Sequence, residues 1–530
     1  MSDPFSPGRR RFLAGSAILT SAALAAPFAT WTTGAFASQQ GATKGGILRV
    51  SVNQAASVIH PLLTRVQSEH LITELLYSNL TKLSLNMTAE PDLAESWSPN
   101  DDLTEWTFKI RKGVVFHDGT PCTAKDVAAT YAAIRDPKTA SPAKAMISVI
   151  QDVIAVDEHT VVMKLSSPFA DIPTTVAFTS TRIIPAHIAT GDLSRLSREA
   201  IGTGPFKLKS LEPDRMVVVE RNEKYFIPEE PHLDRIEVRI YPDAASETSA
   251  LISGDNDLQL VVGESEFDRV KGVSGIDALE VKSGQFLNIN MRCDQKPFND
   301  VRVREALALT VNRDELIGYI TLGSGTRGED VPVNSAYHFY KPQPKRSVNI
   351  SKAKALLAEA GYPNGLTVDL VASDVPGTRA QLAIALREMA RPAGFNINIQ
   401  TMPHTTYLDQ VWKKGKFYVG FYNTQATIDG VFSLLYTSDA AWNETKWNNA
   451  EFDRLVVAAR QTKDERVRSE LYGKAQDLMH AEVPSVTPLF FNLLAAKQSY
   501  VQGYTHHPRG QVFRLERTWL ADGAPKRRAI

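Results

Sequence analysis

Alternating hydrophobic and polar residues in the first half of the chain predict β-strands. In EWTFKI (105–110), Trp106, Phe108 and Ile110 share one face. Thr107 and Lys109 share the other, which is the period of two that a half-buried strand requires. Similar apolar runs predict further strands in GGILRVSVNQ (45–54), HTVVMKL (159–165), RMVVVER (215–221) and DRIEVRIYP (234–242). The chain up to about residue 289 is therefore predicted to be rich in strands.

The second half of the chain shows apolar residues at helical spacing, interrupted by short strand-like runs. Helices are predicted at 303–320, 351–360, 379–394, 406–415 and, as a pair, at 451–483. Strands are predicted between them at 366–373, 395–402 and 416–423. Three successive helix–strand units favour an α/β architecture with a mainly parallel sheet.

A polar stretch at 117–127, HDGTPCTAKDV, raises the question of a catalytic centre. Asp118 and Gly119 form a turn pair, and Thr123 with Asp126 three residues later fits a helix capping box. Pro137 ends the helix that this box begins, because proline disfavours helical geometry at the preceding residue. We therefore interpret the stretch as structural; His117 alone is weak evidence for chemistry.

The first 37 residues predict a secretory signal peptide. Arg9 and Arg10, followed by Arg11, Phe12 and Leu13, fit the twin-arginine form of such a signal. An apolar run follows and ends in an A-x-A cleavage site at 35–37, so the mature chain is expected to start near Ser38. The apolar run is shorter than the about 20 residues that span a membrane. We therefore expect a soluble periplasmic protein.

Composition narrows the class of protein further. The 530 residues are too many for one core and predict two or three domains. The 59 basic and 59 acidic residues balance, which gives no indication of a nucleic-acid partner or an anionic membrane surface. The only cysteines, Cys122 and Cys293, are expected to be free thiols rather than a disulfide. They lack histidine partners at zinc spacing, so no metal and no cofactor are predicted.

Motifs for catalysis are weak or absent. GSGTRG (323–328) matches G-x-G-x-x-G but follows a helix instead of opening one, so we interpret it as a loop. The sequence contains no G-x-S-x-G, H-E-x-x-H or P-loop motif. His506 and His507 are predicted to lie in a surface loop, pointing to opposite sides. The chain is therefore not expected to be an enzyme.

Four motifs in order make the chain resemble a known family. They are PDLAESWSPNDDLTEWTFKIRKGVVFHDGTPCTAKDV (91–127), GTGPFKL (202–208), KPFNDVRVREALALTVNRDEL (296–316) and AKALLAEAGYPNG (353–365). The chain resembles the family 5 extracellular solute-binding proteins, which are dipeptide-, oligopeptide- and nickel-type periplasmic receptors of ABC importers. In that family the first motif belongs to a small structural domain, which supports the structural interpretation of 117–127.

The resemblance implies a two-lobed periplasmic binding protein fold of the large class C type. Domain I would be split over 40–80, 181–285 and 487–530, with a small domain inserted at 81–180. A second lobe, domain III, would span 286–486. Crossovers near 284–288 and 484–491 would form a hinge, and the ligand would close the lobes around itself. The closed form would dock on the permease subunits in the inner membrane, and the receptor itself would be a monomer.

The resemblance also guides the choice of ligand. Peptide-binding relatives hold the α-amino group of the peptide with an acidic residue after a Gly-Trp pair, whereas this chain has Phe421 and, near the acidic position, Thr424. A hydroxyl cannot supply a charge-assisted bond to an ammonium. Dipeptide-binding relatives use an Arg for the ligand carboxylate, where this chain has Ser373 and Asp374, with Arg379 nearby.

A peptide or peptide-like solute is therefore the first expectation. An opine, an oligosaccharide or another amine is the alternative within the same receptor role. A metal-chelate receptor and a secreted hydrolase are more distant alternatives. From strand ends, which face the crevice in open α/β sheets, we predict a cleft lined on one side by residues 65–70. The predicted ligand-binding residues are Arg65, Gln67, Ser68, Asp374, Tyr422, Asn423, Thr424, Asp429 and Trp442.

Overall fold

The structure is a computed structural model that describes residues 42–56 and 59–526. The predicted signal peptide, with Arg9, Arg10 and its cleavage site, lies outside the described residues. Within the described part of the chain, no helix combines the length and the apolar character needed to cross a bilayer.

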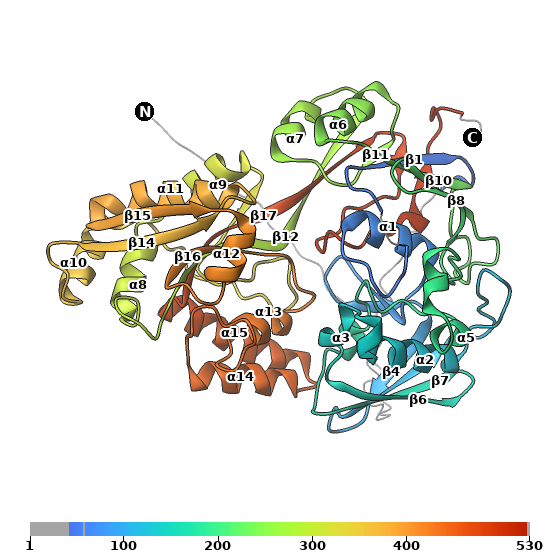
Figure 1. Cartoon of the computed structure of the whole chain (residues 1–530), viewed down its shortest axis with the longest axis horizontal. Coiled ribbons are helices and arrows are strands. Elements are labelled where there is room, and N and C mark those ends of the chain that lie inside the picture. The colour runs from blue at the N-terminus through green and yellow to red at the C-terminus, as the bar shows by residue number, and fades with distance from the viewer. Residues whose placement is uncertain (1–41, 57–58, 527–530) are drawn as a thin grey trace, which may run out of the picture. The chain divides into compact units, whose positions relative to one another are not determined.

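One large mixed sheet organises the described chain (Figure 1). Its strand order is β15-β14-β16-β12-β17-β11-β1-β10-β9-β8, and β13 pairs with β17. The strands are β1 Ile47–Val52, β8 Phe206–Glu212, β9 Met216–Arg221, β10 Arg235–Ile240, β11 Leu258–Gln259, β12 Ile276–Met291, β13 Gly325–Arg327, β14 Leu366–Ser373, β15 Phe395–Met402, β16 Phe417–Tyr422 and β17 Ser485–Gln498.

The prediction of a mainly parallel sheet in the second half is confirmed for three strands and wrong for the pairs that involve β12. β14 is parallel to both β15 and β16, as the helix–strand units predict. β16 then pairs antiparallel with β12, and β12 pairs antiparallel with β17. The reason is that β12, which enters this region from the first half of the chain, lies between β16 and β17 and runs opposite to both.

A separate four-stranded antiparallel sheet, β4-β5-β7-β6, confirms the alternating pattern. Trp106, Phe108 and Ile110 are buried, whereas Lys109 is exposed. The strands are β4 Ala94–Pro99, β5 Glu105–Ile110, β6 Ile150–Asp157 and β7 Thr160–Leu165. Helix α2 (Ala124–Arg135) packs against β6 and β7, and its predicted capping box of Thr123 and Asp126 is present.

Helices surround both sheets. In the first half they are α1 Gln67–Leu76, α3 Ala143–Met146, α4 Ile172–Thr175, α5 Ala186–Ala189, α6 Ala244–Ser253 and α7 Glu264–Val270. In the second half they are α8 Val301–Ala308, α9 Arg313–Thr321, α10 Ile350–Glu359, α11 Thr378–Ala390, α12 His404–Gln410, α13 Ile428–Leu435, α14 Ala450–Arg460 and α15 Glu465–Glu482. Two short ribbons complete the fold, β2 Thr81–Leu83 with β3 Ala89–Pro91, and β18 Val501–Gln502 with β19 Trp519–Leu520.

The hydrophobic side chains divide into separate cores. The largest core takes its residues from 48–260 and 501–515, and two others take theirs from 286–491. The long strands β12 and β17 run side by side (Figure 1), with a register irregularity between Lys282 and Gln285. These cores agree with a two-lobed fold; the domain boundaries given above stay a prediction.

Two local expectations are corrected and one is confirmed. His506 and His507 do not lie on the surface, because both side chains are buried, and the His507 ring pairs with the distant carbonyl of Ser84 at 2.9 Å. The loop expected at 323–328 contains β13, whose backbone pairs with β17. Cys122 and Cys293 are free thiols, as predicted.

Candidate ligand cavity

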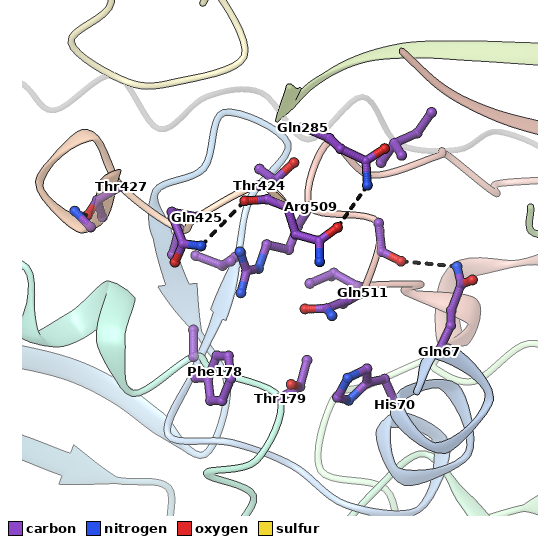
Figure 2. Close-up of a pocket in the computed structure, with 18 of the residues that line it drawn as sticks. Gln67, His70, Phe178, Thr179, Gln285, Thr424, Gln425, Thr427, Arg509 and Gln511 are labelled. Atoms are coloured by element: carbon purple, nitrogen blue, oxygen red, sulfur yellow. Dashed lines mark hydrogen bonds between the residues drawn. The ribbon is translucent and has the colours of Figure 1, made fainter. Parts of the chain in front are cut away.

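A cavity of about 1190 Å³ lies between segments from both halves of the chain. Residues 64–70, 142–179, 260–264 and 506–512 contribute to one wall. Residues 285, 423–434, 442 and 491–494 contribute to the other. Figure 2 shows the polar side chains of both walls facing one another. Strand β17 passes the cavity at residues 491–494, so the sheet itself positions the two walls.

One wall carries uncharged hydrogen-bonding side chains at the end of β16. The Gly284 N–H donates to Thr424 Oγ1 at 3.1 Å, and Gln285 Nε2 donates to Asn423 Oδ1 at 2.8 Å. The Gln425 N–H donates to the Tyr337 hydroxyl at 3.1 Å. These bonds tie the segment after β16 to β12 and to Tyr337, so its side chains are held in place before any ligand arrives.

The opposite wall is built from α1 and from two loops that are distant in sequence. Gln67 Nε2 donates to the Gly510 carbonyl at 3.1 Å, which joins the first turn of α1 to the segment near the C-terminus. The Arg509 guanidinium lies 5.9 Å from the centroid of the Phe178 ring. His70 and Thr179 lie on this same wall and are buried (Figure 2).

The electrostatics of the cavity follow from burial. Burial lowers the pKa of His70 to about 3 and the pKa of His506 to about 4, so both imidazoles are neutral at pH 7. Burial also lowers the pKa of Arg509, to about 10, which still leaves the guanidinium charged at pH 7. The remaining charged lining residues are Arg65, Glu264 and Asp429.

The structure brings six of the nine predicted ligand-binding residues to the cavity. Those six are Arg65, Gln67, Asn423, Thr424, Asp429 and Trp442. Asp429 is 4% exposed and forms an ion pair with Arg460 at 3.0 Å. Its charge is therefore already compensated by the protein. The role of these residues in ligand binding stays a prediction.

Ser68, Asp374 and Tyr422 do not line the cavity, and each has a local reason. Ser68 is buried and donates to the Ala55 carbonyl at 3.2 Å. Asp374 is exposed in the turn that follows β14. Tyr422 is buried, and its hydroxyl donates to the buried Glu444 carboxyl at 2.5 Å. Burial raises the pKa of that Glu444 carboxyl to about 7.

Sequence reasoning missed most of the other lining residues, among them Thr179, Gln285, Arg509 and Gln511. Thr179, Arg509 and Gln511 lie in segments without regular secondary structure, where no periodic pattern marks an inward side chain. The dipeptide Pro508-Arg509 after the two histidines reads as an ordinary turn. Contacts with segments more than 400 positions away, such as Gln67 of α1 and the Ser84 carbonyl, bring this segment to the cavity.

The described residues contain no cluster of three or more His, Cys, Asp or Glu side chains that could hold a metal ion. The cavity instead offers amide, hydroxyl and guanidinium groups beside apolar surface from Phe178, Leu434 and Trp442. Such a mixture binds an organic solute through a few hydrogen bonds and apolar packing.

Comparison with known proteins gives consistent matches over most of the chain. Residues 88–446 match the model of the bacterial extracellular solute-binding proteins, family 5 middle. The glutathione-binding protein GsiB of Escherichia coli K12 is 27% identical over 476 residues, covering 86% of this chain and 91% of the relative. The dipeptide-binding protein of Escherichia coli K12 is 26% identical over 470 residues, covering 82% and 87%. The solute-binding protein MoaA of A. tumefacien R10, solved with mannopinic acid, has a TM-score of 0.70, 26% identity and coverage of 91% and 100%.

Proposed function

Because the chain belongs to family 5 of the bacterial extracellular solute-binding proteins, the substrate-binding receptors of ABC importers, we propose that it captures a peptide or peptide-like solute in the cavity. Family members bind peptides and work with ABC transporter permeases. The solute would occupy the space between the two walls and be delivered to the permease subunits. The receptor would act as a monomer and without a cofactor.

The observation that carries this proposal is the cavity wall after β16. Small-molecule sites commonly occupy about 300–1,000 Å³, and the cavity of about 1190 Å³ suits a short peptide or a solute of similar size. Amide and hydroxyl side chains at 423–427 match the alternating donors and acceptors of a peptide backbone. This wall supports a solute rich in amide or hydroxyl groups.

An opine is the second candidate, and Thr424 is the observation that favours it. A peptide with a free α-ammonium needs a carboxylate partner in a buried site. Thr424 Oγ1 accepts the Gly284 N–H and offers only its own hydroxyl to a ligand. The neighbour MoaA was solved with mannopinic acid, so a solute whose amine is substituted, and which has no primary α-ammonium, is the second candidate for this cavity.

Solute binding is expected to bring the lobes together, because only the closed state makes contacts from both walls at once. We expect small-angle X-ray scattering to give a smaller radius of gyration when a peptide that binds in a thermal-shift screen is present at saturation. A peptide that gives no thermal shift serves as the control and should leave the radius unchanged. An equal radius with and without the bound peptide would contradict the closure mechanism.

Export is proposed to follow the twin-arginine route. Replacing Arg9 and Arg10 together by Lys should leave the protein in the cytoplasm at its precursor size, because that pathway reads the arginine pair. Fractionation and mass spectrometry of the N-terminus check this. A processed periplasmic protein starting near Ser38 in the variant would point to the general secretory route instead.

A further inference from the structure

The guanidinium of Arg509 carries a positive charge that the protein itself does not compensate. Among residues 42–56 and 59–526, no carboxylate forms an ion pair with Arg509. Several other buried arginines are paired, such as Arg468 with Asp171 at 2.6 Å. Arg379, which is also buried, has no ion pair among the described residues but does not line the cavity. A partly buried cation without a counterion is costly unless a ligand supplies the opposite charge.

The backbone around Arg509 is fixed. Its N–H donates to His507 Nδ1 at 3.0 Å, and the next carbonyl, that of Gly510, accepts from Gln67 at 3.1 Å. The Phe178 ring beside the guanidinium covers part of its surface. The charge is therefore held at the cavity wall (Figure 2) in a preorganised position.

A second observation comes from the same wall. Thr179 Oγ1 and His70 Nδ1 are buried and have no hydrogen-bond partner among the described residues. Both residues line the cavity and are 3% exposed. Buried polar atoms of this kind are nearly always satisfied in a protein. Thr179 follows Phe178, whose ring centroid lies 5.9 Å from the Arg509 guanidinium. A hydroxyl and a guanidinium are both donors that suit an oxyanion.

The acidic residues of the cavity do not offset this charge. Asp429 is held by Arg460 at 3.0 Å, which leaves Glu264, at the start of α7, as the second acidic lining residue. Arg65 adds another positive charge on the Arg509 side of the cavity. With both lining histidines neutral, the wall around Arg509 favours an anionic group.

We infer that Arg509 and Thr179 form a subsite for a carboxylate of the solute, so that this receptor takes acidic peptide-like solutes. The inference rests on the proposed function. It places the carboxylate on the wall formed by α1 and residues 506–512, and not at the turn that holds Asp374, which does not line the cavity. The uncharged wall at 423–427 then receives the remaining amide or hydroxyl groups.

Calorimetric titration with matched ligand pairs tests the subsite. The probes are dialanine, trialanine, glutathione and mannopinic acid, each beside its carboxamide counterpart. For at least one pair, the wild-type protein should bind the acid about 10- to 100-fold more tightly than the carboxamide, the size of a charge-assisted hydrogen bond. Arg509→Gln should lose that factor for the acid and leave carboxamide binding unchanged.

Matched variants separate the subsite from general effects. Arg509→Lys should retain part of the preference, and Thr179→Val should lose about three- to tenfold for the acid. Asp374→Asn removes a charge outside the cavity and should change affinity less than threefold. Thermal unfolding of each variant confirms that it is folded.

The outcomes are distinct. Equal binding of acid and carboxamide by the wild-type protein, with Arg509→Gln unchanged, would overturn the carboxylate subsite and leave the peptide-receptor role standing. Failure of the wild-type protein to bind any member of the panel would overturn the proposed ligand class, and the subsite with it.

Discussion

Replacing Arg313 by Met should lower the free energy of unfolding by about 3–5 kcal/mol, because it leaves a buried carboxylate without its main partner. Arg313 and Asp330 are both 0% exposed, and Arg313 Nη2 lies 2.8 and 2.7 Å from the two carboxylate oxygens. Arg346 lies 2.7 Å from the same carboxylate and cannot replace the bonds that Arg313 makes to backbone carbonyls. Chemical denaturation of the two proteins measures the difference.

Two controls test the reason for this loss. Arg466→Met breaks an exposed pair with Glu470 on α15 and should cost at most about 0.5 kcal/mol. The double variant Arg313→Met with Asp330→Leu removes both buried charges and should be more stable than Arg313→Met alone. A loss below 1 kcal/mol for Arg313→Met would contradict the role given to this buried pair.

Acid should destabilise the fold through four buried histidines, His60, His70, His506 and His507. Burial lowers the pKa of His507 from 6.5 to about 4. The positive charges of Arg514 and Arg509 lower this pKa further, whereas the Ser84 carbonyl, 2.9 Å from Nε2, opposes the lowering. Nδ1 accepts the Arg509 N–H at 3.0 Å. A second proton would have to go to Nδ1, where the Arg509 N–H already donates, so the unfolded chain takes up that proton first.

The direction in which pH changes the unfolding free energy follows from the difference in histidine pKa between the folded and the unfolded chain. A histidine with a lowered pKa contributes its full stability above pH 6.5 and loses it as the pH falls toward 4. For His507 the loss between pH 7 and pH 4 amounts to about 3 kcal/mol. Buried acids such as Glu444, whose pKa is raised to about 7, act in the opposite direction over part of this range. The test therefore compares the pH dependence of the unfolding free energy between variants, because the pH dependence of the wild-type protein alone contains both contributions.

His507→Gln should reduce the loss of unfolding free energy between pH 7 and pH 4 by about 3 kcal/mol relative to the wild-type protein. Denaturant titrations at several pH values measure it. His187→Gln replaces an exposed histidine on α5 and should leave the pH dependence unchanged. An identical pH dependence for His507→Gln and the wild-type protein would contradict a neutral, buried His507.

The same two histidines show where sequence reasoning stops. Trp106, Phe108 and Ile110 reveal their strand because a period of two is a local property, and Thr123 with Asp126 reveals a helix start for the same reason. His506 and His507 carry no such pattern. The position of His507 depends on contacts with segments more than 400 positions earlier, such as the Ser84 carbonyl.

Some residues of the candidate site could likewise be predicted from a local pattern, and others could not. Asn423 and Thr424 could be predicted because they follow a strand whose end faces the crevice. Arg509 could not, since its place at the cavity depends on the bond between Gln67 and the Gly510 carbonyl. Asp374 also follows a strand, yet its turn leads it away from the cavity lining. Strand ends therefore indicate a region, whereas tertiary contacts decide which side chains reach it.

The most direct test of the receptor is whether its solute occupies this cavity. Native mass spectrometry of gently purified protein should show the wild-type chain carrying a small non-covalent solute that is released on denaturation. Ala426→Trp fills part of the cavity lining with a large side chain and should remove that solute. Ala132→Trp, on the exposed face of α2, should carry it like the wild-type protein. The account predicts loss of the solute in Ala426→Trp alone; full occupancy in that folded variant would contradict it.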